Sequence, residues 1–66
     1  MKDYQQRVVD EQADLQAKLT KLLTFLGTSK FHDLEREEQS RLQRQYTAMN
    51  EYSEVLAERI ATFKEV

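Results

Sequence analysis

The segment YQQRVVDEQADLQAKLTKLLTFLG, residues 4–27, decides the fold of this chain. Its apolar residues recur at intervals of three, four and seven, at Val8, Leu15, Leu19, Leu22 and Leu26. Such spacing places side chains on one face of an α-helix. Gly27 is the only glycine, and it predicts a helix C-cap in the left-handed conformation. We therefore expect one helix over about residues 3–26.

A second apolar stripe predicts another long helix in the C-terminal half. It consists of Leu42, Tyr46, Met49, Leu56, Ile60 and Phe63. Asp33 is the expected N-cap, and Glu35, Glu37 and Glu38 place negative charge in the first turn, where the helix dipole favours it. The sequence thus predicts a helix over about residues 34–63.

The stretch between the two helices, about residues 27–33, is the expected loop. Thr28 and Ser29 can cap a short helical turn, and Phe31 and Leu34 are expected to fold back over the helix ends. Two helices joined by so short a connection pack antiparallel. The fold class is therefore all-α, a single helical-hairpin domain over residues 1–66.

Size and composition point to self-association. A chain of 66 residues buries too little surface to be more than marginally stable alone. It has no cysteine for disulfides, and one histidine, His32, which cannot form a transition-metal site by itself. Apolar residues also flank both stripes, at Val9, Leu23, Tyr52 and Val55. We expect these flanks to be buried in a symmetric homo-oligomer.

Several function classes are disfavoured by the sequence. The net charge is −2 and no basic block occurs, which argues against DNA or RNA duplex binding. No signal peptide or membrane span is evident, so a cytoplasmic location is expected. There is no Gly-rich phosphate loop, Cys nucleophile or His-x-x-x-His pair. We expect no enzyme activity, no metal and no cofactor.

One strip of the first helix does not fit a purely apolar interface. Tyr4, Glu11 and Lys18 are seven residues apart, and the second helix carries a matching strip at Gln45, Tyr52 and Arg59. One interpretation is that these are interface-edge residues, whose long stems cover apolar neighbours. The other is that a ring and a cation in an oligomer groove bind the base and phosphate of a nucleotide.

Arg7 belongs to the second interpretation as well. It lies one helical turn from both Tyr4 and Glu11. Glu11 is expected to hold Arg7 in place through an i,i+4 contact.

The segments "YQQRVVDEQADLQAKLTKLLTFL" and "EEQSRLQRQYTAMNEYSEVLAERI" resemble the helical-hairpin domain of small phage proteins, the anti-CBASS and Thoeris anti-defence sponges. The resemblance covers residues 4–63. It rests on Arg7-Val8 with Glu11, Leu15 and Lys18, on the "KLLTFL" end of the first helix, and on the progression from Gln45 to Ile60.

This resemblance implies a non-enzymatic homo-hexamer that sequesters cyclic oligonucleotides in the host-cell cytoplasm. It implies that Tyr4 stacks on a base of a cyclic dinucleotide held between protomers, while Lys18 meets a phosphate. Arg59 is the residue implied at separate cyclic trinucleotide sites, and Arg7 is a further candidate for phosphate neutralisation. The alternative function is a protein–protein interaction module or scaffold whose exposed flanks bind a host or phage protein.

Overall fold

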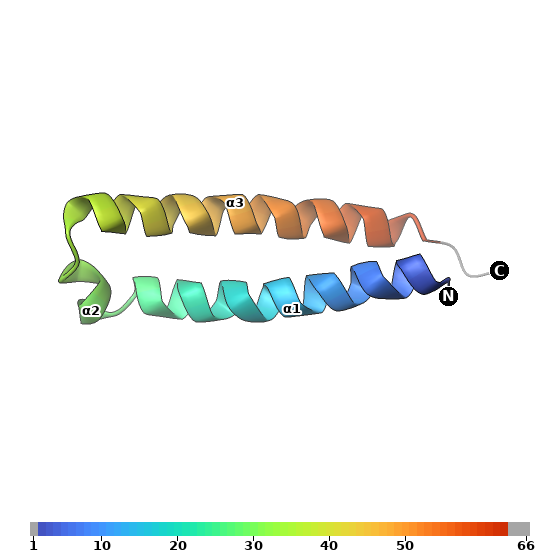
Figure 1. Cartoon of the computed structure of the whole chain (residues 1–66), viewed down its shortest axis with the longest axis horizontal. Coiled ribbons are helices and arrows are strands. Elements are labelled where there is room, and N and C mark those ends of the chain that lie inside the picture. The colour runs from blue at the N-terminus through green and yellow to red at the C-terminus, as the bar shows by residue number, and fades with distance from the viewer. Residues whose placement is uncertain (1, 64–66) are drawn as a thin grey trace.

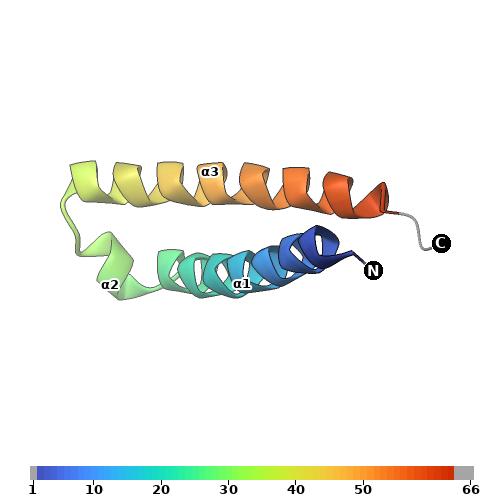
Figure 2. The same ribbon diagram turned by 45° about the vertical axis from the view of Figure 1, so that its right-hand side comes forward.

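The computed structural model describes residues 2–63, which form an all-helical fold with three helices: α1 (Asp3–Leu26), α2 (Ser29–His32) and α3 (Arg36–Ala61). Figure 1 shows the two long helices, α1 and α3, lying side by side and antiparallel, with α2 at the end where the chain reverses. Figure 2 shows the same arrangement after a turn of 45°. The fold over residues 2–63 is thus a helical hairpin.

The first helix occupies the range that its apolar spacing predicts. At its start the backbone N–H of Lys2 donates to Gln5 Oε1 at 2.9 Å, which ties the entering chain to the first turn. At its end Gly27 has φ −90° and ψ 4°, so the expectation of a left-handed C-cap is wrong. The chain does not reverse at Gly27, because Gly27 keeps a negative φ and the extended Thr28, with φ −97° and ψ 159°, leads directly into α2.

Replacing Gly27 with alanine is expected to stabilise the protein by about 0.4–1 kcal/mol. An L-residue adopts φ −90° without strain, and alanine lowers the conformational entropy of the unfolded chain. An added Cβ meets only the carbonyl oxygen of Thr24, at 3.6 Å, an ordinary contact. Urea unfolding followed by circular dichroism measures the difference. A loss of stability would indicate that the position requires glycine after all.

The connection contains a one-turn helix, α2, as Thr28 and Ser29 predicted. The hydroxyl of Thr28 accepts a hydrogen bond from the backbone N–H of Phe31 at 3.3 Å and caps α2. Phe31 is buried and packs edge-to-face on Phe25, with 6.2 Å between ring centroids. This aromatic pair closes the end of the hairpin, so that α1 and α3 are joined by a packed corner.

The second long helix begins two residues later than the sequence predicted. Asp33 is the C-cap of α2 instead of the N-cap of α3, and Glu35 takes the N-cap position. The side-chain amide of Gln39 donates to the carbonyl oxygens of Leu34 at 2.8 Å and His32 at 3.1 Å. The start of α3 is later than predicted because Asp33 still caps the end of α2, and the chain turns only after it.

The core lies in the seam between the two long helices. Val8, Leu15, Leu19 and Leu56 are its buried members, and four partly buried side chains pack against them: Tyr46, Met49, Ile60 and Phe63. All eight belong to the two stripes found in the sequence. The predicted stripes are therefore the faces on which the helices meet.

Polar side chains interrupt the seam at its middle. Ser53 is 2% exposed, and its hydroxyl is hydrogen-bonded to the side-chain amide of Gln16. Gln12 Nε2 also donates to the backbone carbonyl of Ser53, at 3.3 Å. These bonds fix the register of α1 and α3 relative to each other, because they hold the third-to-last turn of α3 opposite the middle of α1.

The hairpin is a rod with one layer of helix on either side of the seam. Its dimensions are 52 × 14 × 14 Å and its radius of gyration is 15.2 Å, against about 11 Å for a compact chain of 66 residues. Each long helix therefore covers one side of the other, and the flanks of the seam are open.

Candidate functional site

An open groove of about 420 Å³ follows one flank of the seam. It is lined by six residues of α1 and one of α3: Arg7, Asp10, Glu11, Asp14, Leu15, Lys18 and Tyr52. Leu15 is a buried core residue, so the floor of the groove is the apolar seam itself. The walls are charged on the α1 side and aromatic on the α3 side.

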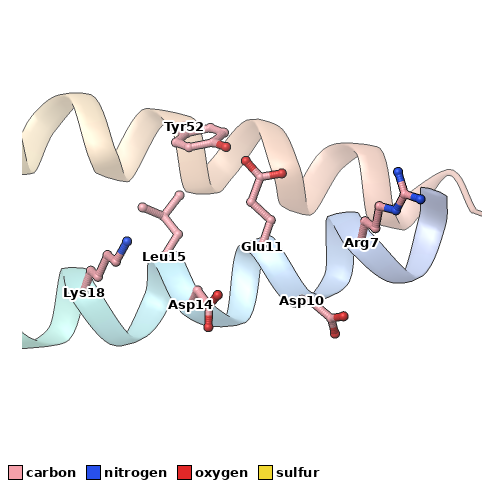
Figure 3. Close-up of a pocket in the computed structure, with 7 residues that line it drawn as sticks. All are labelled: Arg7, Asp10, Glu11, Asp14, Leu15, Lys18 and Tyr52. Carbon is pink, nitrogen blue, oxygen red and sulfur yellow. The ribbon is translucent and has the colours of Figure 1, made fainter. Parts of the chain in front are cut away.

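Figure 3 shows that the lining residues separate into two sets by direction. Arg7, Glu11 and Lys18 point from α1 toward α3, as does Leu15, whereas Asp10 and Asp14 point away from α3. Three charges therefore face the groove, two positive and one negative. Positive charge thus predominates among the side chains directed into the groove, although the seven lining residues together carry more acids than bases.

The charges that face the groove are not paired within the hairpin. Among residues 2–63 the ion pair that forms is Arg41 Nε to Glu38 Oε1, at 2.8 Å and far from the groove residues in sequence. The expected contact between Glu11 and Arg7 is not formed, and Figure 3 shows Glu11 directed toward Tyr52 instead. Both cations are thus open to an external partner.

The spacing of the two cations restricts what they can bind. Arg7 and Lys18 are eleven residues apart, which corresponds to about 16 Å of helix at 1.5 Å per residue. One phosphate contacts both only when the two side chains extend toward each other along the groove. A ligand with two separated anionic groups suits the spacing of the two cations better.

Tyr4 lies outside the groove, at the open end of the hairpin. Its ring packs edge-to-face on Phe63, with 5.9 Å between centroids, and remains 52% exposed. Lys18 is fourteen residues away, or about 21 Å along α1. The two residues therefore lie at separate places along α1, and only Lys18 lines the groove.

Arg59 is also outside the groove lining. It is exposed in the last turn of α3, and it follows Tyr52 by seven residues, so both residues lie on the same side of that helix. Of the four residues that the sequence suggested as ligand contacts, the structure brings Arg7 and Lys18 into one groove.

Tyr52 is a groove residue that the sequence reasoning did not select. The sequence pattern places Tyr52 in a strip with Gln45 and Arg59, but it does not show which residues of α1 lie opposite that strip. The missing information is the register of the hairpin, which the bonds from Gln12 and Gln16 to Ser53 establish. That register brings Tyr52 opposite Leu15 and makes it the aromatic wall.

Among the described residues there is no group of three or more side chains suited to hold a metal ion, and no helix long and apolar enough to cross a membrane. The fold and the groove define a class of protein, the small helical hairpin with an open, mixed-charge binding groove.

The chain belongs to the Sequestin family, whose model matches residues 2–62. It is also similar to a protein of Enterobacteria phage T4, described as an uncharacterized 7.5 kDa protein in the denB–rIIB intergenic region. The two are 41% identical over 61 residues, which cover 92% of this chain and 95% of the phage protein. No solved structure matches this chain significantly. It is thus a small sequestin-like protein with a phage relative, and the family's name suggests a sequestering role.

Proposed function

We propose that this protein is a phage anti-defence sponge. In this proposal it binds cyclic oligonucleotide immune messengers, cyclic di- or trinucleotides, and holds them without cleaving them. Binding takes place between protomers of a symmetric homo-oligomer, of which a hexamer is our expected form, in the cytoplasm of the host cell. The ligand is thereby withheld from the effector that it would activate.

The observation that carries the proposal is the groove, in which two unpaired cations face an aromatic wall. Arg7 and Lys18 offer charged donors to phosphates, and Tyr52 offers a ring on which a base can stack. Stacking on an aromatic ring is worth about 1–3 kcal/mol per base. The groove thus offers the two kinds of contact that a nucleotide needs. The name of the family, Sequestin, supports sequestration in general.

A holding role also agrees with the openness of the groove. Glu11, Asp10 and Asp14 are all exposed, so a carboxylate here works in contact with water. General acid–base catalysis depends on a side chain positioned at the reacting atoms, usually in a site that closes and excludes water. An open groove favours sequestration over cleavage.

The proposal that sites lie between protomers rests on two features of the hairpin. The rod leaves the flanks of its seam uncovered, and Tyr4 lies outside the groove, about 21 Å from Lys18 along α1. Tyr4 of one protomer and Lys18 of another can meet the same ligand. Arg59, on the same side of α3 as Tyr52, is our candidate for a third contact from a neighbouring copy.

Calorimetric titration with a small panel of cyclic di- and trinucleotides tests the function, with the solution mass measured in parallel. We expect tight binding with a few protomers per ligand. Lys18→Ala is expected to weaken binding by about ten- to a hundredfold, the value of a charge-assisted hydrogen bond, while the helical fold stays intact. Lys30→Ala, which removes an exposed lysine from α2, is the matched control and should bind as the wild type does. A well-folded oligomer that binds nothing in the panel would refute the proposal.

A second candidate function is favoured by two exposed apolar side chains. Leu23 and Val55 are 55% and 48% exposed, and burying apolar side chains against a partner is favourable. In that case the partner is a host or phage protein. Binding would then depend on apolar flank residues such as Val9 and Val55, and Lys18→Ala would leave it unchanged.

A further inference from the structure

One strip of α1 is complementary in charge to an antiparallel copy of itself. Tyr4, Glu11, Lys18 and Phe25 are seven residues apart, and seven residues are nearly two full turns, so the four lie along one side of the helix. The order is aromatic, acid, base, aromatic. We call these four residues the α1 strip, and its acid and base both line the groove.

We propose that a second copy of this chain packs on the α1 strip, antiparallel to the first and related to it by a twofold axis between Asp14 and Leu15. In this arrangement Glu11 faces the partner's Lys18, and Tyr4 faces the partner's Phe25. The symmetry repeats each contact, because a twofold interface uses the same surface on both subunits.

The charges of the strip favour this register over its neighbours. A shift of the antiparallel pairing by one heptad in one direction sets Glu11 against its own copy, and the opposite shift sets Lys18 against its own copy. Parallel packing sets both residues against their own copies. Each of these arrangements brings like charges together, which costs stability at an interface.

The same two charges have no ion-pair partner in the hairpin. Neither Glu11 nor Lys18 forms an ion pair with another residue between 2 and 63. Seven residues correspond to about 10 Å of helix, and the two side chains do not pair with each other in the hairpin. A second copy supplies each with an opposite charge.

An exposed aromatic ring lies at the level of the proposed axis. Tyr52 immediately precedes Ser53 in α3. Ser53 is hydrogen-bonded to Gln12 and Gln16, which lie on either side of the proposed axis on α1. Tyr52 is 44% exposed although it borders the core, and Val55, one turn further, is 48% exposed. A copy packed on the α1 strip covers this flank of α3, where the two Tyr52 rings approach the axis from either side.

This pairing rests on the proposed function, since it specifies how two protomers form the shared ligand site. Glu11 is then a positioning residue for the partner's Lys18. A lysine ammonium has three donors, so one hydrogen bond to Glu11 leaves two for a ligand phosphate. The pairing also explains why an acid lies between two cations in a groove proposed for anions.

Sedimentation equilibrium on nucleotide-free protein with three charge variants tests the pairing. Glu11→Lys and Lys18→Glu each create two like-charge contacts per dimer, and each is expected to weaken dimerisation by about ten- to a hundredfold at low salt. The double variant Glu11→Lys/Lys18→Glu restores both contacts with reversed polarity, so its dissociation constant should return to within about threefold of the wild type. Lys30→Glu is the matched control, because it reverses an exposed charge on α2.

Mixing the two single variants tests whether the strip itself is the interface. A chain with Glu11→Lys carries two lysines in its strip and a chain with Lys18→Glu carries two glutamates, so we expect the mixed dimer to form when neither variant dimerises by itself. The double variant tests the register, because its strip matches its own copy in the antiparallel register and not in the parallel one. Circular dichroism of each variant shows whether the hairpin is folded. A wild-type protein that stays monomeric overturns the pairing, and so does an oligomer that is indifferent to these substitutions. Nucleotide binding is measured separately, so failure of the pairing is distinguishable from failure of the sponge function.

Discussion

Replacing Leu56 with alanine is expected to destabilise the protein by about 2–5 kcal/mol, as large-to-small substitutions at buried leucines do. Leu56 is 1% exposed and lies in the core with Val8, Leu15 and Leu19. A chain of 66 residues has about 3–10 kcal/mol of stability in total. The loss is therefore large enough to unfold much of the protein at room temperature.

Because the protein consists of two packed long helices, it has little means of compensating for this loss of stability. The truncated side chain leaves a cavity in the seam, and only α1 and α3 are available to close it. Urea unfolding followed by circular dichroism, at several protein concentrations because association adds stability, gives the free energy of unfolding. Leu23→Ala removes the same atoms from a leucine that is 55% exposed and should cost less than about 1 kcal/mol. Equal losses at both positions would mean that Leu56 is not the centre of the core.

Replacing Ser53 with leucine is expected to destabilise the protein by about 1–3 kcal/mol, the usual cost of overpacking. Ser53 is 2% exposed and lies where α3 packs beside the middle of α1. A leucine there must displace the neighbouring helix, and it also removes the hydroxyl that is bonded to Gln16. Both effects act on the register of the hairpin, and the groove wall at Tyr52 is expected to shift with it.

Two further variants at serines separate these effects. Ser53→Ala removes the hydroxyl without adding volume and should cost about 0.5–1.5 kcal/mol, the net value of one hydrogen bond. Ser40→Leu adds the same volume at an exposed position of α3 and should change stability by less than about 0.5 kcal/mol. Thermal and urea unfolding give the order of the three. A Ser53→Leu protein as stable as the Ser40→Leu protein would show that the helices do not approach closely at this point.

The polar middle of the seam was not predictable from hydrophobic spacing. Ser53 falls between Met49 and Leu56 in the second stripe, where the pattern leads one to expect an apolar residue. Its significance appears only when α1 supplies Gln12 and Gln16 as partners. Hydrogen bonds between residues some forty positions apart depend on the register of the two helices, which local sequence does not specify.

The ends of the helices show a similar division. The cap at Thr28 and the packing of Phe31 follow from local residue types and were predicted. The predictions of a left-handed Gly27 and of an Asp33 N-cap were both wrong. Gly27 has a negative φ, and Asp33 caps the end of α2 instead of the start of α3. Turn-forming residues in the sequence indicate that the chain bends. The path of the bend depends on tertiary packing, here the contact of Phe31 with Phe25.

The sequence by itself determined the two long amphipathic helices, their antiparallel pairing and the face that each buries, because hydrophobic periodicity and a short connection are local properties. It also determined that Arg7 and Lys18 share one side of α1 with Tyr4 and Glu11. Only the tertiary structure decided that Tyr52 forms the wall opposite Arg7 and Lys18 and that Tyr4 packs on Phe63 at the far end. The physical reason is that a groove between two helices depends on their register, and this register is fixed by the contacts of Ser53, which form only after the chain has folded back on itself.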